Sequence, residues 1–322
     1  MNEAAPGLVT VFGGSGFVGS QVVQALARRG WRVRVACRRP DRAYKLQTSG
    51  HVGQLQAVRC DATDPADVAA ALAGADAAIN LIGILYESGR RTFHALHVEA
   101  ARNIAEACAA ANIDRLVHIS AIGADPESPS DYALSKAAAE MAVREVKPNA
   151  VVIRPSIVFG AGDSFLNRFA DMAQIAPALP LIGGGQTKFQ PVYVGDVAEA
   201  VARATMTQDA AGRTFELGGP AVMTFEDVLK LVLRETYRRR LLLPLPFFAA
   251  RALGSLAQLT ALVGIAPALT RDQVVLLQRD NVVADSAEGL AELGIEPTGV
   301  DAIAPSYLWR YRRGGQFAEA AA

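Results

Sequence analysis

The sequence is poor in the residues that build disulfide frameworks and metal sites. It has three cysteines, Cys37, Cys60 and Cys108, which lie far apart in 322 residues. An odd number of separated cysteines is typical of reduced thiols in the cytosol and argues against a metal site. Lysine is also scarce: 5 of the 32 cationic residues are lysine, and 32 carboxylates balance the total. Without net charge or lysine clusters, we expect no nucleic acid as a partner.

Two further features are missing, a leader and an uninterrupted membrane-spanning run. No basic and apolar leader precedes the apolar run Leu8–Phe12, so we expect no secretory signal and a cytoplasmic protein. Residues 252–270 carry no charge, but polar residues and a proline interrupt them, which argues against a span of about 20 apolar residues. Within them, helical spacing separates Leu253, Leu256, Leu259 and Val263. The stretch 241–270 therefore predicts apolar helices, either buried in the core or lying on a membrane surface or a membrane-embedded partner.

What the sequence does have is a regular alternation of apolar strands and alanine-rich helices over its first half. The predicted strands are Leu8–Phe12, Arg32–Cys37, Gln54–Cys60, Ala77–Ile82, Leu116–Ser120 and Ala150–Arg154. The predicted helices are Phe17–Arg29, Pro65–Leu72, Phe93–Ala111 and Tyr132–Val146. This alternation predicts an α/β fold, a Rossmann-type doubly wound parallel sheet with a smaller, mostly helical C-terminal region.

The chain length predicts one large domain with a smaller companion. We expect a Rossmann domain over residues 1–155, a C-terminal region over 156–313 and a disordered tail over 314–322. A predicted helix, Tyr193–Thr205, and a predicted strand, Arg213–Gly218, indicate that residues 192–218 return to the Rossmann domain. Phe225–Arg240 is predicted as an amphipathic helix that ends in three arginines.

The strongest motif is a run of glycines directly after the first strand. Gly13, Gly16 and Gly19 are spaced by three residues and lead into a predicted helix. Gly13 permits a tight turn, Gly16 lets backbone N–H groups approach a pyrophosphate, and Gly19 allows the helix to pack closely on the strand. Because the strand, turn and helix all fall where this mechanism needs them, the motif predicts dinucleotide binding rather than an ordinary glycine turn.

The second strand ends in Arg38 and Arg39, where an NAD-selective site places an acidic residue against the ribose 2′-hydroxyl. A guanidinium there favours the 2′-phosphate of NADPH through charge-assisted hydrogen bonds, although a solvated basic turn is the alternative. Asp61, just past the third strand, is placed to accept from the adenine amino group, and it also suits a turn.

Tyr132 and Lys136 stand four residues apart at the start of a predicted helix, on one face of it. In a reductase the cation lowers the phenol pKa for proton exchange with a carbonyl or alcohol, and the lysine also binds the nicotinamide ribose. The preceding strand ends at Ser120. We therefore predict Tyr132, Lys136 and Ser120 as catalytic residues.

These motifs together resemble the extended or atypical branch of the short-chain dehydrogenase/reductase superfamily. Further landmarks of that branch are Asn80-Leu81-Ile82-Gly83, Arg154-Pro155 and Val192–Val197. More narrowly, residues 163–167, 269–274 and 280–283 resemble bacterial forms of the alpha subcomplex subunit nine accessory proteins of respiratory complex I, NADH:ubiquinone oxidoreductase. The predicted cofactor-binding residues are Gly13, Ser15, Gly16, Phe17, Val18, Arg38, Arg39, Asp61, Leu81, Ile82, Gly83, Tyr132, Lys136 and Pro155.

The narrower resemblance implies tightly bound NADPH (or NADP+) as a structural element, beside complex I subunits at the junction of the membrane and peripheral arms. It also implies a peripheral position on the cytoplasmic face of the inner membrane. Active members of the superfamily often carry a second hydroxyl next to Ser120, where this chain has Ala121. If catalysis requires the hydroxyl that Ala121 lacks, Tyr132 and Lys136 mainly bind the ribose. The alternatives are an active NADP-dependent reductase, epimerase or dehydratase on a small molecule or quinone precursor, and a redox sensor that responds to NADPH occupancy.

Overall fold

The computed structural model describes residues 6–258, 260, 267 and 269–318, and the chain divides into two compact units. The first unit comprises Met1–Pro155, Gly195–Leu217 and Asp285–Ile295. The second comprises Ser156–Val194, Gly218–Ala284 and Glu296–Ala322. Both units therefore contain segments that are distant in sequence.

A seven-stranded parallel sheet in the order β11-β6-β5-β4-β1-β2-β3 forms the centre of the first unit. Its strands are β1 (Leu8–Phe12), β2 (Arg32–Cys37), β3 (Leu55–Arg59), β4 (Ala77–Asn80), β5 (Arg115–Ile119), β6 (Val151–Pro155) and β11 (Thr214–Leu217). The predicted Rossmann-type doubly wound sheet is thus confirmed. Its central strands β1 and β4 are almost completely buried, as expected for parallel strands covered on both faces.

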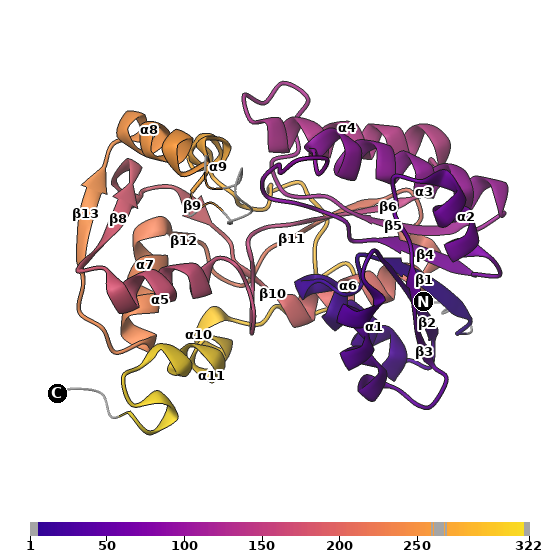
Figure 1. Cartoon of the computed structure of the whole chain (residues 1–322), viewed down its shortest axis with the longest axis horizontal. Helices are drawn as coiled ribbons and strands as arrows, with labels where there is room; N and C mark the ends of the chain where they lie inside the picture. Colours follow the sequence, from indigo (N-terminus) through magenta and orange to yellow (C-terminus); the bar gives the residue numbers. More distant parts are fainter. Residues whose placement is uncertain (1–5, 259, 261–266, 268, 319–322) are drawn as a thin grey trace. The chain divides into compact units, whose positions relative to one another are not determined.

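Helices cover both faces of this sheet (Figure 1). On one face lie α2 (Pro65–Leu72), α3 (Ala100–Ala110) and α4 (Asp131–Val146); on the other lie α1 (Phe17–Arg28) and α6 (Val194–Met206). Small side chains such as Ala71, Ala105 and Ala139 let the first group pack closely on the strands. An ion pair between Arg29 and Glu199 connects the α1 and α6 segments.

Side-chain caps set the starts of two of these helices. Asp64 accepts a hydrogen bond from Ala66 N at 2.9 Å, with Pro65 at the first helical position of α2. Ser130 accepts from Ala133 N at 3.3 Å and begins α4 one residue before the predicted start. The predicted helix Phe93–Ala111 is divided: a π-helical turn, η2 (His94–Glu99), precedes α3.

Short strands and helices make up the second unit. Its strands are β7 (Val158–Phe159), β8 (Ala178–Ile182), β9 (Lys188–Phe189), β10 (Val192–Tyr193), β12 (Met223–Thr224) and β13 (Leu241–Leu245). Its helices are α5 (Leu166–Ile175), α7 (Phe225–Glu235), α8 (Phe247–Gln258), α9 (Arg271–Leu276), α10 (Val300–Ile303) and α11 (Pro305–Leu308). An aromatic cluster of Phe165, Phe169, Phe189 and Phe225 contributes to its core.

Two predictions for this unit are wrong. Helix α7 ends at Glu235 rather than Arg240, because Tyr237 takes a left-handed φ of +53° and Arg238 N turns back to Leu233 O at 3.0 Å. The stretch 241–270 is not helical throughout, since Leu241–Leu245 is a strand paired with β8. Pro244 lies within that strand and disfavours a helix there.

The structure describes two of the four apolar side chains that were predicted to share a helix face within 241–270. Leu253 and Leu256 lie on α8 with exposed side chains, whereas Leu259 and Val263 lie outside the described residues. No helix in the described part of the chain is long and apolar enough to span a membrane.

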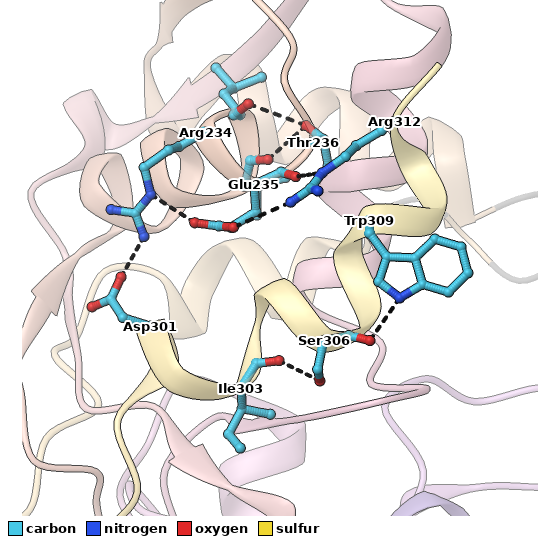
Figure 2. A network of polar contacts seen from close by, with 10 residues as sticks. Arg234, Glu235, Thr236, Asp301, Ile303, Ser306, Trp309 and Arg312 are labelled. Atoms are coloured by element: carbon cyan, nitrogen blue, oxygen red, sulfur yellow. Dashed lines mark hydrogen bonds and ion pairs between the residues drawn. The ribbon is translucent and has the colours of Figure 1, made fainter. Parts of the chain in front are cut away.

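The C-terminal segment is attached to the end of α7 by a polar network (Figure 2). Arg312 Nε donates to the Glu235 carbonyl oxygen at 2.7 Å, and its guanidinium lies 3.9 Å from the centre of the Tyr237 ring. Arg234 pairs with Asp301 on α10 and also with the Glu235 carboxylate, at 2.8 Å. Within the predicted tail, Gly315–Phe317 forms a short 3-10 helix, and residues 319–322 lie outside the described residues.

Candidate nucleotide-binding site

The sheet order reverses between β1 and β4, which are adjacent and continue in opposite directions to β2 and β5. At such a switch point the loops after the two strands separate and leave a crevice at the carboxyl ends. A cavity of about 550 Å³ occurs at the carboxyl ends of β1, β2, β3 and β4. The cavity is lined by Phe12, Gly13, Ser15, Gly16, Ala36, Cys37, Arg38, Arg39, Arg42, Cys60, Asp61, Ala62, Leu81, Ile82, Gly83, Ile84, Arg91 and Leu96.

The glycine turn has the geometry that backbone binding of a phosphate requires. Gly13 has a φ of +77°, and a Cβ atom there would lie 3.1 Å from the backbone of Leu81. At Gly19 a Cβ would lie 2.3 Å from the Gly13 carbonyl oxygen, so only glycine allows α1 to approach the turn. Gly16 is the N-cap of α1 and has no side-chain cap, which leaves the first N–H groups of the helix available. These features fit a dinucleotide pyrophosphate.

Arginines occupy the wall after β2. Arg38 and Arg39 both line the cavity and are exposed. Arg39 pairs with Asp41 at 3.1 Å, and this hydrogen bond lowers the pKa of the Asp41 carboxyl. Asp61 lies on the neighbouring wall, where its Oδ1 accepts from both the backbone N and the hydroxyl of Thr63. Asp61 therefore forms the turn predicted for it, while also facing the cavity.

Lys136 is buried close to Gly83, a residue of the cavity lining. Its Nζ donates to the Ile119 carbonyl oxygen at 3.1 Å and lies 3.6 Å from the position that a Cβ on Gly83 would occupy. Burial lowers the pKa of Lys136 to about 8, and the nearby Glu140 carboxylate partly opposes this shift. Gly83 lines the cavity, whereas Lys136 does not.

Tyr132 packs in a small aromatic cluster at the same end of the sheet. Its ring makes edge contacts with Phe93, at a centroid distance of 5.9 Å, and with His97, at 5.6 Å. Ile84 and Leu96, which line the cavity, belong to the same cluster. Ser120 is buried, and its hydroxyl has no hydrogen-bond partner among the described residues.

Two buried histidines, which the sequence did not single out, support this region. His97 Nε2 accepts from Ile84 N at 3.0 Å, and its Nδ1 lies 2.8 Å from the Ser135 hydroxyl. Because that hydroxyl donates to the Tyr132 carbonyl oxygen, His97 carries its proton on Nδ1 and is neutral. Burial lowers the pKa of His97 to about 2 and that of His118 to about 3. His97 thereby links the helix of Tyr132 and Lys136 to the cavity wall.

The structure gathers nine of the predicted residues around the cavity: Gly13, Ser15, Gly16, Arg38, Arg39, Asp61, Leu81, Ile82 and Gly83. Phe17, Val18, Ser120, Tyr132, Lys136 and Pro155 do not line it. The most consequential omissions from the prediction are Arg42 and Arg91. Arg42 follows Arg38 by four residues and could have been proposed from this spacing, whereas no local motif marks Arg91.

Comparison with known proteins places the chain in a family. Residues 9–218 match the NAD-dependent epimerase/dehydratase family, and the chain belongs to it. Within this family it belongs with the alpha subcomplex subunit 9 proteins. It is 36% identical over 308 residues to the mitochondrial NADH dehydrogenase [ubiquinone] 1 alpha subcomplex subunit 9 of Rattus norvegicus, covering 95% of this chain and 80% of that protein. The protein of the same name from Arabidopsis thaliana is 35% identical, with 96% and 79% covered.

Solved structures with low sequence identity show the same fold. The NADPH-dependent quinone oxidoreductase QOR2 of Escherichia coli, complexed with NADPH, matches with a TM-score of 0.70 at 21% identity. The match covers 94% of this chain and 99% of that one.

Proposed function

We propose that this chain is an NADPH-binding accessory subunit of respiratory complex I, in which the nucleotide is a structural cofactor. The observation that carries the nucleotide assignment is the arginine wall after β2. Arg38 and Arg39 occupy the position where an acidic residue would select NAD, and they match the charge of a 2′-phosphate. The identity to complex I alpha subcomplex subunit 9 proteins over most of the chain supports the assignment to complex I.

Different predicted residues would bind different parts of the nucleotide. The turn from Gly13 to Gly16 and the start of α1 would hold the pyrophosphate, Arg38 and Arg39 the 2′-phosphate, and Asp61 the adenine. Lys136, which lies close to Gly83, would be on the nicotinamide side. A bound nicotinamide would supply a hydride, so the surrounding groups decide whether turnover follows.

Three features of the nicotinamide side support a structural role. Ala121 lacks the hydroxyl that active members often carry, and the loss of such a donor weakens transition-state stabilisation by about 3 to 4 kcal/mol. Ser120 is only 2% exposed and does not line the cavity. The Lys136 ammonium is held by a backbone carbonyl. None of these three features places a proton donor in the cavity.

The apolar part of the second unit supplies a candidate membrane contact. Residues 236–271 contain five arginines and no carboxylate. Within them, large apolar side chains are exposed on β13 and α8: Leu241, Leu243, Phe248, Leu253 and Leu256. Arginine beside exposed leucine and phenylalanine suits the headgroup region of an anionic bilayer. We place the protein on the cytoplasmic face of the inner membrane, next to complex I subunits at the junction of the membrane and peripheral arms.

Affinity purification tests the complex I assignment. Tagged protein isolated from membranes in mild detergent should bring down complex I subunits, and their absence would remove this assignment. The membrane contact is tested separately by flotation with vesicles of anionic and of neutral phospholipids. Binding only to anionic vesicles, weakened in a Leu253→Glu/Leu256→Glu variant, is expected; equal binding of the variant would contradict the contact.

The presence of both Tyr132 and Lys136 on α4 favours a second function, an active NADP-dependent reductase, epimerase or dehydratase. The pKa of Lys136, lowered to about 8, would suit proton transfer near neutral pH. The test is NADPH oxidation, followed by nicotinamide absorbance, across a panel of carbonyl and quinone compounds. Turnover that disappears in Tyr132→Phe would establish this function in place of the structural one.

A further inference from the structure

The cavity is strongly cationic in a chain that has no net charge. Its charged lining consists of four guanidinium groups, those of Arg38, Arg39, Arg42 and Arg91, and one carboxylate, that of Asp61. The formal charge of this lining is therefore +3, whereas the formal charge of the whole chain is zero. A concave site with such an excess attracts and retains a ligand with several negative charges.

The nearby carboxylates neutralise only part of this excess. One oxygen of Asp61 is engaged by Thr63, and Asp41 is paired with Arg39. Over the described ranges, no carboxylate lies within ion-pair distance of Arg38, Arg42 or Arg91. Three guanidinium groups at the cavity are thus available for a ligand.

These groups come from two walls. Arg38 directly follows β2, and Arg42 lies in the first turn of the 3-10 helix η1 (Pro40–Ser49). Arg91 belongs to the connection between β4 and η2, nearly fifty residues later. Its backbone is fixed by a tight turn in which Ser88 N donates to Arg91 O at 3.1 Å and Arg91 N donates to Ser88 O at 3.0 Å. The second wall therefore carries one arginine on a hydrogen-bonded turn.

Arg91 lines the cavity from the connection that follows β4, and the end of β4 lies next to the glycine turn. A Cβ on Gly13 would lie 3.1 Å from the Leu81 backbone, so the end of β4 is in contact with the glycine turn. That turn is the place for the pyrophosphate, whereas the 2′-phosphate belongs at the end of β2. We infer that Arg91 is a further nucleotide-binding residue, which contacts the pyrophosphate of the dinucleotide from the wall opposite α1. This inference rests on the proposed NADPH binding and adds a second cationic wall to it.

Substitutions in the two walls should change the affinities for NADPH and NADH differently. The reason is that the pyrophosphate is common to both nucleotides, whereas only NADPH carries the 2′-phosphate. Arg91→Gln should weaken the binding of NADPH and NADH by the same factor, about ten-fold, the size expected for one lost charge-assisted hydrogen bond. Arg38→Gln should weaken NADPH alone. Arg90→Gln is the matched control, since Arg90 is the exposed neighbour of Arg91 and does not line the cavity.

The experiment is titration of the nucleotide-free full chain with NADPH and with NADH by calorimetry, for wild type and the three variants. Thermal unfolding without nucleotide establishes that each variant is folded. Equal losses for the two nucleotides in Arg91→Gln, with Arg90→Gln unchanged, support the inference. Unchanged affinity in Arg91→Gln, or a loss confined to NADPH, overturns it. If wild type binds neither nucleotide, the proposed function itself fails. That result differs from unchanged nucleotide affinity in Arg91→Gln, which overturns only the inference about Arg91.

Discussion

His97 Nε2 accepts a hydrogen bond from the Ile84 amide at 3.0 Å, inside the first unit and next to the cavity wall. The imidazole can accept this bond only while it is neutral, and burial keeps it so by lowering its pKa to about 2. A residue that does not line the cavity therefore holds the Gly83–Ile84 segment against the helix of Tyr132 and Lys136.

Because His97 and His118 are both buried and neutral, we expect the free energy of unfolding to decrease in acid. The ordinary imidazole pKa is 6.5, and in the folded chain it falls to about 2 for His97 and about 3 for His118. Between pH 6.5 and about 3 the unfolded chain therefore binds more protons than the folded chain, so stability falls as pH falls through this window. Each histidine contributes a slope of about 1.4 kcal/mol per pH unit.

Urea unfolding followed by the fluorescence of buried Trp31 measures this slope between pH 7 and pH 5, in a Trp309→Phe background. In His97→Gln the slope should decrease by the contribution of one imidazole. An identical slope in the variant would show that His97 is protonated in the folded chain.

Gly16 and Gly19 should respond differently to the same substitution. In Gly16→Ala the new methyl group lies 3.3 Å from the Gly13 carbonyl oxygen, a contact that a small shift relieves, but it occupies the approach of the pyrophosphate. In Gly19→Ala the corresponding distance is 2.3 Å, and the helix must move away from the glycine turn. We expect Gly16→Ala to fold normally without NADPH, and Gly19→Ala to lose about 3 kcal/mol or more of stability. Nucleotide titration with thermal unfolding measures both, and equal stability of the two variants would contradict the described turn.

Arg154 and Glu140 form a bidentate ion pair that links β6 to α4. Arg154 Nε lies 2.9 Å from Glu140 Oε1 and Nη2 lies 2.7 Å from Oε2, and hydrogen bonding to Glu140 raises the pKa of Arg154. Because Glu140 is buried, Arg154→Leu should destabilise the fold by about 3 to 5 kcal/mol. The Glu140→Gln/Arg154→Leu double variant should be more stable than the sum of the single effects predicts. Simple additivity in urea unfolding would mean that the two groups do not interact.

Two ion pairs at the end of α7, Arg312 with Glu235 and Arg234 with Asp301, should contribute differently to stability (Figure 2). Arg312 is mostly buried and combines a hydrogen bond to Glu235 O with stacking on Tyr237, whereas Arg234 and Asp301 are exposed. Arg312→Ala should therefore cost about 2 kcal/mol, and Asp301→Ala less than about 1 kcal/mol. Trp309 fluorescence in a Trp31→Phe background reports the unfolding of this unit. A larger effect from Asp301→Ala would reverse the assigned roles.

The parts of the site that could be predicted from sequence are those determined by neighbours in the chain. The glycine turn, Arg38 and Asp61 each follow a strand directly, so the parallel sheet brings them to one edge without further information. Arg91 and His97 lie in a connection whose turn and π-helix depend on packing, and no periodicity marks them. The same holds for Asp285–Ile295, which groups with the first unit although it is distant in sequence.

The end of α7 shows why local patterns also mislead. The amphipathic pattern continues to Arg240, but the left-handed Tyr237 stops the helix at Glu235 and allows Arg312 to stack on the tyrosine ring. A positive φ at a non-glycine residue depends on tertiary contacts and is invisible in the amphipathic pattern. Pro244 disfavours a helix at Leu241–Leu245, but proline does not by itself predict a strand, so the pairing of this segment with β8 depends on tertiary structure.

The central claim is that the arginine wall holds NADPH, and the nucleotide released from purified full-length protein on denaturation tests it most directly. We expect NADPH or NADP+ from wild type, and none from Arg38→Glu, which places a carboxylate where the 2′-phosphate is expected. The Arg38→Glu variant should keep wild-type thermal stability in the absence of nucleotide, because Arg38 is exposed. An empty wild-type site, or NADH in it, would contradict the account.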